Sequence, residues 1–193
     1  MADTSSQQPT VYDYATGTQW RLAFNRLPKT TWFCTAANIP GITLGEAQYA
    51  TPMTDMIVTG DKLTFETMTM GFIVDEELAN YRELWDWLVG IGAPSLHSQY
   101  PAVLAKGQGV TSYSVAPDAD PRQKATPSEG NVYSDAQLII YDSKNIPKVN
   151  VNFKDMFPTS ISSLEYTQGA TDIEYLKATV SFRYTYYHFE TAT

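Results

Sequence analysis

The chain has 193 residues, a length that fits one domain, and 43 % of them are hydrophobic, which is enough for a packed core. With 21 acidic against 13 basic residues the formal net charge is −8, which excludes a protein that grips nucleic acid through clustered Lys and Arg. One cysteine excludes an intrachain disulfide, and one cysteine with two histidines excludes a Cys/His zinc site. Only 18 % of the residues are charged, which favours a surface partly covered by partners.

The N-terminal residues, 1–18, are polar and rich in Ser, Gln and Thr, and we expect them to form a flexible arm. They lack the basic and apolar blocks of a signal peptide, and no apolar run in the sequence is long enough to cross a bilayer. We therefore expect a product made in the cytoplasm, without a membrane anchor or a membrane partner.

Two strands are predicted after the arm. In Gln19–Asn25 three apolar residues occupy alternate positions, which indicates a half-buried strand. A turn is predicted at 26–29. Thr31–Asn38 is rich in Thr and aromatic residues, which predicts the second strand.

The segment that follows is less regular. Residues 43–60 have no clear period, and Pro52 argues against a central strand because proline cannot donate to the hydrogen-bond ladder. Asp55–Val58 predicts only a short edge strand, with a turn after it. Leu63–Val74 predicts a long strand whose apolar residues change phase midway, which indicates a β-bulge near 66–67.

One amphipathic helix is predicted over Glu76–Gly90, with Asp75 as its N-cap and Gly and Pro residues after its end. Its apolar residues follow the 3.6-residue period, and we expect them to pack on the strands: Leu78, Tyr81, Leu84, Trp85 and Leu88. Trp87 lies at the edge of this stripe, where it would touch either a neighbouring subunit or the loops of its own domain.

Residues 93–133 have no clear period and are rich in Pro, Gly, Ser and Ala, which predicts a long inserted loop. Four strands are predicted after it: Ala136–Tyr141, Val149–Phe153, Ser160–Thr167 and Ile173–Tyr187. Strands on both sides of one helix indicate a mainly β, antiparallel barrel or sandwich with one packed α-helix, in a single domain over residues 19–190.

The sequence offers no constellation of residues that supports catalysis. His97 and His188 have no Cys or His nearby, and Cys34 lies in a strand pattern, where a buried inert thiol is expected. Asp55 and Asp61 are explained as turn residues. We therefore expect a protein that is not an enzyme and that holds no metal and no cofactor.

Four motifs follow one another along the chain. They are the QWRLAFN strand, a Cys-x-Ala-x-x-x-Pro-Gly stretch at 34–41, a Gly-Asp-x-x-x-Phe stretch at 60–65, and Phe-Pro-Thr-Ser at 157–160 before the last strand. In this order they resemble the tail-tube protein family of contractile, T4-like phages, which includes baseplate tube-initiator proteins. The similarity covers about 19–90 and 136–187, and the segment 93–133 looks longer than the corresponding connection in a plain tube subunit.

The resemblance implies a structural virion protein of the tail. Its barrel would join copies of itself into a six-membered ring around a channel through which DNA passes, and neighbouring tube or baseplate rings would be partners, with tail sheath as a further candidate. The resemblance also implies that the excursion at 45–62 protrudes and reaches the adjacent ring, with four apolar residues in that contact: Met53, Met56, Ile57 and Val58. The acidic surplus favours an acidic or neutral channel wall, to which a polyanion would not stick.

A second hypothesis is a receptor- or carbohydrate-binding β-domain of a tail fibre. The aromatic content of 13 % and the long loop favour it. Rings seen by electron microscopy would favour the first hypothesis, and glycan binding by an isolated monomer would favour the second.

Overall fold

The computed structural model describes residues 14–24, 26–92, 94, 100, 132–169 and 175–192. Most of the predicted arm and almost all of the predicted insertion at 93–133 lie outside these residues. The described elements, in chain order, are β1 (Trp20–Phe24), α1 (Pro28–Trp32), β2 (Cys34–Ala37), β3 (Ile42–Tyr49), β4 (Met56–Phe65), β5 (Met68–Ile73), α2 (Ala79–Gly92), β6 (Ser134–Tyr141), β7 (Pro147–Ile161), β8 (Lys177–Arg183) and β9 (Tyr186–Thr191). All strand pairs are antiparallel, so the predicted mainly β fold class is confirmed.

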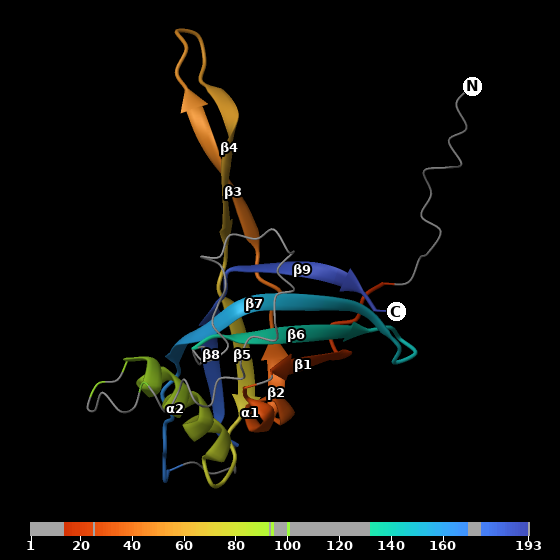
Figure 1. The fold of residues 1–193 in the computed structure, drawn as a ribbon, viewed down its shortest axis with the longest axis vertical. Coiled ribbons are helices and arrows are strands. Elements are labelled where there is room, and N and C mark those ends of the chain that lie inside the picture. Colours follow the sequence, from red (N-terminus) through yellow and green to blue (C-terminus); the bar gives the residue numbers. More distant parts are fainter. Residues whose placement is uncertain are drawn as a thin grey trace, which may run out of the picture.

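Two sheets share the long strand β7. Its N-terminal part pairs with β6 on one side and β9 on the other, and β6 also pairs with β1, so this sheet has the order β1-β6-β7-β9 and is called sheet A. The C-terminal part of β7 pairs with β8, which continues through β5 to β2, and this sheet is called sheet B. The strands of sheet A run side by side in Figure 1.

The chain turns from one sheet to the other at Asp155. This residue has a positive φ of 56°, which lets β7 bend between its pairing with β9 and its pairing with β8. On the other side of the bend, Tyr184 and Thr185 separate β8 from β9, and the Thr185 amide donates to the Lys154 carbonyl over 3.0 Å. The bend within β7 and the passage of the chain from β8 to β9 therefore lie at the same place, where one sheet gives way to the other.

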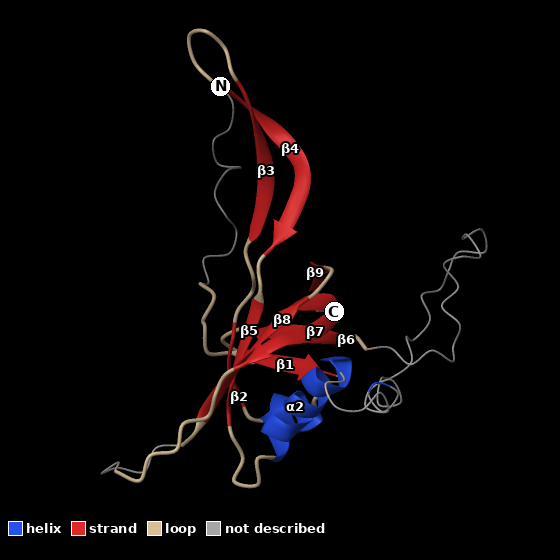
Figure 2. Ribbon diagram, turned by 90° about the vertical axis from the view of Figure 1, so that its left-hand side faces the viewer, coloured by secondary structure: helices blue, strands red, loops and turns tan. Residues whose placement is uncertain are grey.

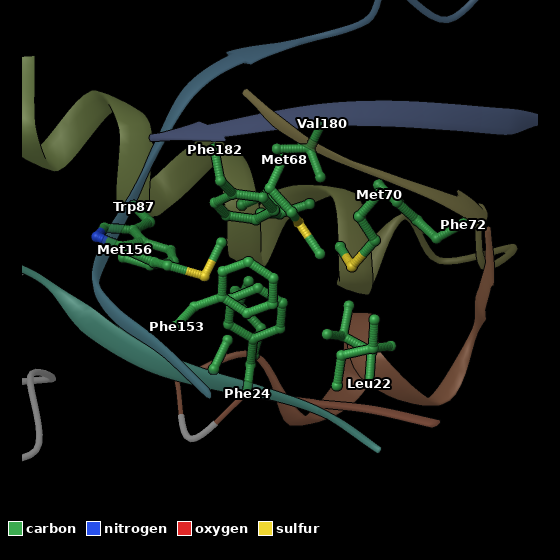
Figure 3. Packing of buried hydrophobic residues seen from close by; sticks show 14 of the residues in the cluster. Leu22, Phe24, Met68, Met70, Phe72, Trp87, Phe153, Met156, Val180 and Phe182 are labelled. Atoms are coloured by element: carbon green, nitrogen blue, oxygen red, sulfur yellow. The ribbon is translucent and has the colours of Figure 1, made fainter. Parts of the chain in front are cut away.

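The core lies between the inner faces of the two sheets. Sheet A contributes Leu22, Phe24, Leu138 and Phe153, and sheet B contributes Met68, Met70, Phe72, Val180 and Phe182, all buried. Figure 3 shows the two sets facing one another. The rings of Phe24 and Phe182 lie 5.1 Å apart across this core. The alternating buried pattern of β5 and β8 agrees with the sequence period from which their apolar faces were predicted.

The helix α2 closes one end of the core. Leu84 and Trp87 are buried, Leu78, Tyr81 and Leu88 are half-buried, and Trp85 is 49 % exposed. This corrects the expectation for Trp85, because Trp87 takes the core position instead. The Trp87 indole Nε1 donates to the Val132 carbonyl over 2.9 Å, and the Arg26 guanidinium lies 4.8 Å from its ring centroid.

The start of α2 differs from the prediction, because the helix begins at Ala79 rather than Glu76. Leu78 has a positive φ of 56°, which no helical residue has, so the chain enters the helix after it. Asn80 holds this entry: its Nδ2 donates to the Ile73 carbonyl over 2.8 Å, and its Oδ1 accepts from the Asp75 amide over 3.2 Å. Asn80 is fully buried, so these bonds satisfy groups that water cannot reach.

A second, short helix was not predicted. The predicted strand Thr31–Asn38 is found as β2, Cys34–Ala37, but its first residues are helical, because Pro28–Trp32 forms α1 with proline at its first position, where a missing amide costs nothing. The buried Thr30 fixes α1 against α2, since its hydroxyl lies 3.1 Å from the Asn80 carbonyl and from the Glu83 carboxylate. Local aromatic and Thr content could not show this contact across more than fifty residues.

The excursion at 43–60 is also more regular than predicted. It forms a long hairpin of β3 and β4, and the expected turn at 60–61 lies inside β4. The predicted strand Leu63–Val74 is two strands, and the chain leaves the hairpin and enters sheet B at the expected change of phase.

The late strands are divided differently from the prediction. Val149–Phe153 and 157–160 belong to the one strand β7, and 162–167 forms no strand. The predicted last strand is interrupted at 184–185 and gives β8 and β9, while Ile173 lies outside the described residues.

Candidate assembly surfaces

The β3–β4 hairpin projects from the rest of the molecule as a separate two-stranded sheet (Figures 1 and 2). Every residue of β3 is exposed, and in β4 only Gly60 and Phe65 are partly covered. A two-stranded hairpin by itself is marginally stable in water. Its exposed apolar side chains therefore indicate a surface that another chain covers.

The hairpin carries apolar pairs on different faces in its two halves. Residues paired directly across two strands share a face. Near the body, one face carries the pairs Ile42–Phe65 and Leu44–Leu63, and the other face carries Thr43–Thr64. Near the tip, one face carries the pairs Ala47–Val58 and Tyr49–Met56, and the other carries Glu46–Thr59 and Gln48–Ile57.

A change of register separates the two halves of the hairpin, between Leu44 and Glu46. Gly45 and Gly60 meet there, so closely that β4 cannot carry a larger residue at position 60 unless the strands move apart. Figure 2 shows β4 curved along its length. The bulge therefore bends the hairpin where its apolar pairing changes.

The four residues predicted to face an adjacent ring all lie in this hairpin. Met53, at the tip, is 96 % exposed, and Met56, Ile57 and Val58 in β4 are 57 %, 68 % and 50 % exposed. The tip turn is held by hydrogen bonds between Thr51 and Thr54. These exposed positions fit a contact with another chain, and the identity of that chain is taken up under the proposed function.

The root of the hairpin is fixed to the corner between β8 and β9. The Tyr187 hydroxyl donates to the Pro40 carbonyl and the Tyr184 hydroxyl to the Glu66 carbonyl, each over 2.9 Å. The ring of Phe65 packs within 6 Å of both tyrosine rings, with centroid distances of 5.9 and 5.7 Å. The hairpin is thus tied to sheet A at its β9 edge and extends beyond that edge (Figure 1).

Both outer strands of sheet A have a free edge among the described residues. β1 pairs with β6 alone, and β9 pairs with β7 alone. Each neighbouring pair in the sheet is antiparallel, so over four strands β9 runs opposite to β1. Free edges of this kind readily pair with another chain.

A row of apolar residues crosses the inner face of sheet A and ends in solvent. Leu22, Leu138, Val151 and Phe189 are paired in sequence across β1, β6, β7 and β9. The first three are at most 4 % exposed, whereas Phe189 is 59 % exposed. The core side of the sheet therefore remains apolar past the edge of the subunit's own core.

A groove of about 730 Å³ runs along the free edge of β1. β1 itself forms one side of it, and the other side is formed by Pro28, Thr31 and Trp32 of α1 with Cys34 and Thr35 of β2. Trp32 is 81 % exposed. This groove is the opening between the two end strands of the sheet path, β1 and β2.

The outer face of sheet A is polar and nearly neutral. One row across the sheet holds Ala23, Gln137, Asn152 and His188, and the next holds Arg21, Ile139, Asn150 and Glu190. The Asn152 Nδ2 donates to the Glu190 carboxylate over 2.9 Å, and Lys154 pairs with Asp135. By strand alternation Lys148 lies on this face as well, so three basic residues, Arg21, Lys148 and Lys154, stand with two acidic ones, Asp135 and Glu190, and the face is close to neutral.

The described residues bring no catalytic group together. His188 lies beside Asn152 and Glu190 on the outer face of sheet A, and His97 lies outside the described residues. Burial raises the pKa of the Cys34 thiol to about 11, which makes it a poor nucleophile. Within the described part of the chain there is no group of three metal-ligating side chains, and no helix there is both long and apolar enough to cross a membrane.

Sequence reasoning missed Phe189 and Trp32 as surface residues. Both stand in apolar patterns that also describe core residues, so only their position at a sheet edge distinguishes them. Gly45 and Gly60 carried a usable signal, because a glycine inside a strand often marks a bulge or a close backbone approach.

The fold has clear relatives among solved structures. A chain of the sheath-tube complex of an extracellular contractile injection system matches with a TM-score of 0.58 at 11 % identity, over 94 % of this chain and 95 % of that one. A chain of the sheath/tube terminator of that system matches with a TM-score of 0.56 at 11 % identity, over 94 % and 99 %. The tube-terminating cap of the anti-feeding prophage matches with a TM-score of 0.53 at 13 % identity, over the whole of both chains. At these identities the similarity shows the fold alone. No curated protein matches the sequence.

These sheets, free edges and the projecting hairpin define a structural subunit of the tail-tube class. A family model described as phage tail tube protein matches residues 9–190, so the chain belongs to the phage tail tube protein family. The family resemblance stated from the sequence is confirmed, and it favours the tail-tube hypothesis over a fibre domain.

Proposed function

We propose that this protein is a ring-forming tube subunit, either of the tube itself or of its baseplate-proximal first ring, and that sheet A closes the ring. The observation that carries this proposal is that sheet A ends in two free edges, β1 and β9, which run in opposite directions. Copies related by rotation about one axis then bring β9 of one copy antiparallel to β1 of the next. An even number of alternating strands allows this pairing to repeat until the ring closes.

We infer six copies in the ring, as the family resemblance implies. In this arrangement sheet A forms the inner wall, and its outer, polar face borders the channel. By strand alternation that face has three basic and two acidic residues, Arg21, Lys148 and Lys154 with Asp135 and Glu190. A wall without clustered cations gives DNA few phosphate contacts, so DNA would slide through rather than bind.

The hairpin then serves contacts beyond its own subunit. It leaves the molecule past the β9 edge, on the side where the next copy would sit (Figure 1), and Met53, in the turn between its two strands, is 96 % exposed. We propose that the tip half, with Met53, Met56, Ile57 and Val58, reaches the adjacent ring. Methionine adapts its shape to an interface, and burial of these side chains would stabilise stacking.

The proposed role is structural and needs no chemistry. The protein would act as a component of the tail particle, with further rings and, as another candidate, the sheath as partners. No catalysis is part of the proposal.

Electron microscopy of the purified protein tests this function. We expect six-fold rings with a central hole, and stacks of rings at higher protein concentration. Hydrogen exchange should become slower in the amides of β1 and β9 on assembly, because both edges become paired. Particles that stay monomeric at every concentration, or DNA binding at micromolar concentration and physiological salt, would contradict the proposal.

A further inference from the structure

We propose that Phe189 of one copy inserts into the groove beside Trp32 of the next copy. Ring closure would then use two contacts, the pairing of β9 with β1 and the insertion of this side chain. This inference rests on the ring proposed above. It assigns residues to each side of the contact and names a second copy of this chain as the occupant of the groove.

Phe189 is positioned for such an insertion. It continues the buried row formed by Leu22, Leu138 and Val151, and it is the one member of that row exposed to solvent. The ring of Tyr187 packs against it with centroids 5.7 Å apart in an edge-to-face arrangement, which limits its conformations before binding. A partly fixed aromatic residue loses little conformational entropy when it binds.

The groove offers what an added strand with an apolar side chain requires. One side of it is the whole of β1, so the backbone of an added strand can pair along it. Trp20, Leu22 and Phe24 of β1 face the core side of sheet A, the same side as Phe189. Trp32 lies across the groove from β1, is 81 % exposed, and would cover an inserted aromatic ring.

The geometry of sheet A favours a second copy over other occupants. If β9 of a neighbour continues sheet A beyond β1, the neighbour's Phe189 stays on the core side, because side chains keep their face across paired strands. The groove follows the edge of β1, and its lining includes the core-side residues Trp20, Leu22 and Phe24. Strand pairing and insertion of Phe189 are therefore satisfied by the same placement.

Two charge substitutions on opposite sides of the contact test the inference. Phe189→Glu removes the inserted ring and leaves the groove, and Trp32→Glu blocks the groove and leaves the ring. Both side chains are exposed, so each variant should keep the circular dichroism and melting temperature of the wild-type monomer. Each alone should weaken ring closure by at least about 30-fold in dissociation constant, as expected for a central aromatic contact.

Mixing the two variants gives the decisive result. Phe189 of the Trp32→Glu copy still fits the groove of the Phe189→Glu copy, while the reverse contact is blocked on both sides. An equal mixture should therefore form a 1:1 dimer and nothing larger, measured by light scattering after size exclusion. Trp85→Glu, an exposed tryptophan on α2, is the matched control and should form wild-type rings.

Several outcomes would overturn the inference. Rings of wild-type stability in either variant would remove Phe189 and Trp32 from the contact while the ring itself stands. A mixture that stays monomeric, or that closes into rings, would show that the two residues do not meet. Rings lost on removing residues 1–13 but kept in Phe189→Glu would assign the groove to the arm. A wild-type protein that forms no rings would overturn the proposed function and this inference together.

Discussion

Gly60 lies against Gly45 so closely that a Cβ on Gly60 would sit 2.5 Å from the Gly45 carbonyl oxygen. Both partners are backbone, so Gly60→Ala must push the two strands apart at the bulge. We expect this variant to lose stacked tubes in electron microscopy while the melting temperature of the monomer stays within about 1 °C, since the hairpin contributes nothing to the core. Gly169→Ala, where an added Cβ meets nothing within 4 Å, is the control.

The tip of the hairpin can be removed to test its role. Deletion of Ala50–Thr54 should leave the monomer folded and allow single rings, but stop their stacking, because the tip half is proposed to reach the adjacent ring. Sedimentation would separate rings from tubes. Met53→Leu keeps an apolar side chain and should stack, whereas Met53→Asp should not. Normal tubes from the deleted chain would refute the contact.

Leu84 and Trp85 are neighbours in α2 with opposite environments. Leu84 is fully buried, so Leu84→Ala should lower the free energy of unfolding by about 2–5 kcal/mol through lost contacts and a cavity. Trp85 is 49 % exposed, and Trp85→Ala should change it by about 0.5 kcal/mol or less. Urea denaturation measures both. Equal effects would mean that the face of α2 has been assigned wrongly.

Asn80 is a buried polar residue whose side chain satisfies two backbone groups, the Ile73 carbonyl and the Asp75 amide. Asn80→Ala removes this partner from both backbone groups, which are partly buried. We expect a loss of at least about 2 kcal/mol in the free energy of unfolding. Asn80→Asp keeps the acceptor and loses the donor, so above the pKa of the new carboxyl it should be no more stable than Asn80→Ala. A silent Asn80→Ala would show that water replaces the amide.

The Cys34 thiol should react slowly with alkylating reagents. Burial raises its pKa from 9.0 to about 11, and only the thiolate reacts. A thiol with a raised pKa is more fully protonated at pH 8, so its alkylation should be slower than in the unfolded chain. The rate should still rise with pH between 9 and 10, where an ordinary thiol levels off. A plateau near pH 9 would contradict the assigned burial.

The alternation of apolar and polar residues along the sequence was sufficient to predict which residues of β5 and β8 form the core. The alternation in the sequence predicted that Met68, Met70 and Phe72 of β5 share one face of their strand, and that Val180 lies on the apolar face of β8. It could do so because each of these strands has one buried face. The family motifs then gave the class of protein correctly.

What the sequence could not show depends on contacts between distant residues. The α1 helix is held by Thr30 against Asn80 and Glu83, so a five-residue segment with strand-like composition becomes helical. Trp87 rather than Trp85 enters the core because the buried face of α2 runs through Asn80, Leu84 and Trp87, a choice that depends on what the helix packs against.

The surfaces were harder still to predict, since periodicity does not distinguish an apolar residue that meets its own core from one that meets another copy. Phe189 and Leu22 occupy the same row of sheet A, and only the strand order shows that one is at the centre and the other at the edge.

The passage of β7 through both sheets has a mechanical consequence. Its fifteen residues, from Pro147 to Ile161, pair with β6 and β9 in sheet A and with β8 in sheet B. Covalent backbone therefore connects the two sheets, and a force along β7 loads several hydrogen bonds of each ladder in shear at once instead of opening them one by one. The bend at Asp155 is pinned by Thr185, whose hydroxyl lies 3.3 Å from the Asp155 carboxylate. The two sheets of such a subunit therefore resist deformation as one unit, and the β3–β4 hairpin is the part that can bend under load.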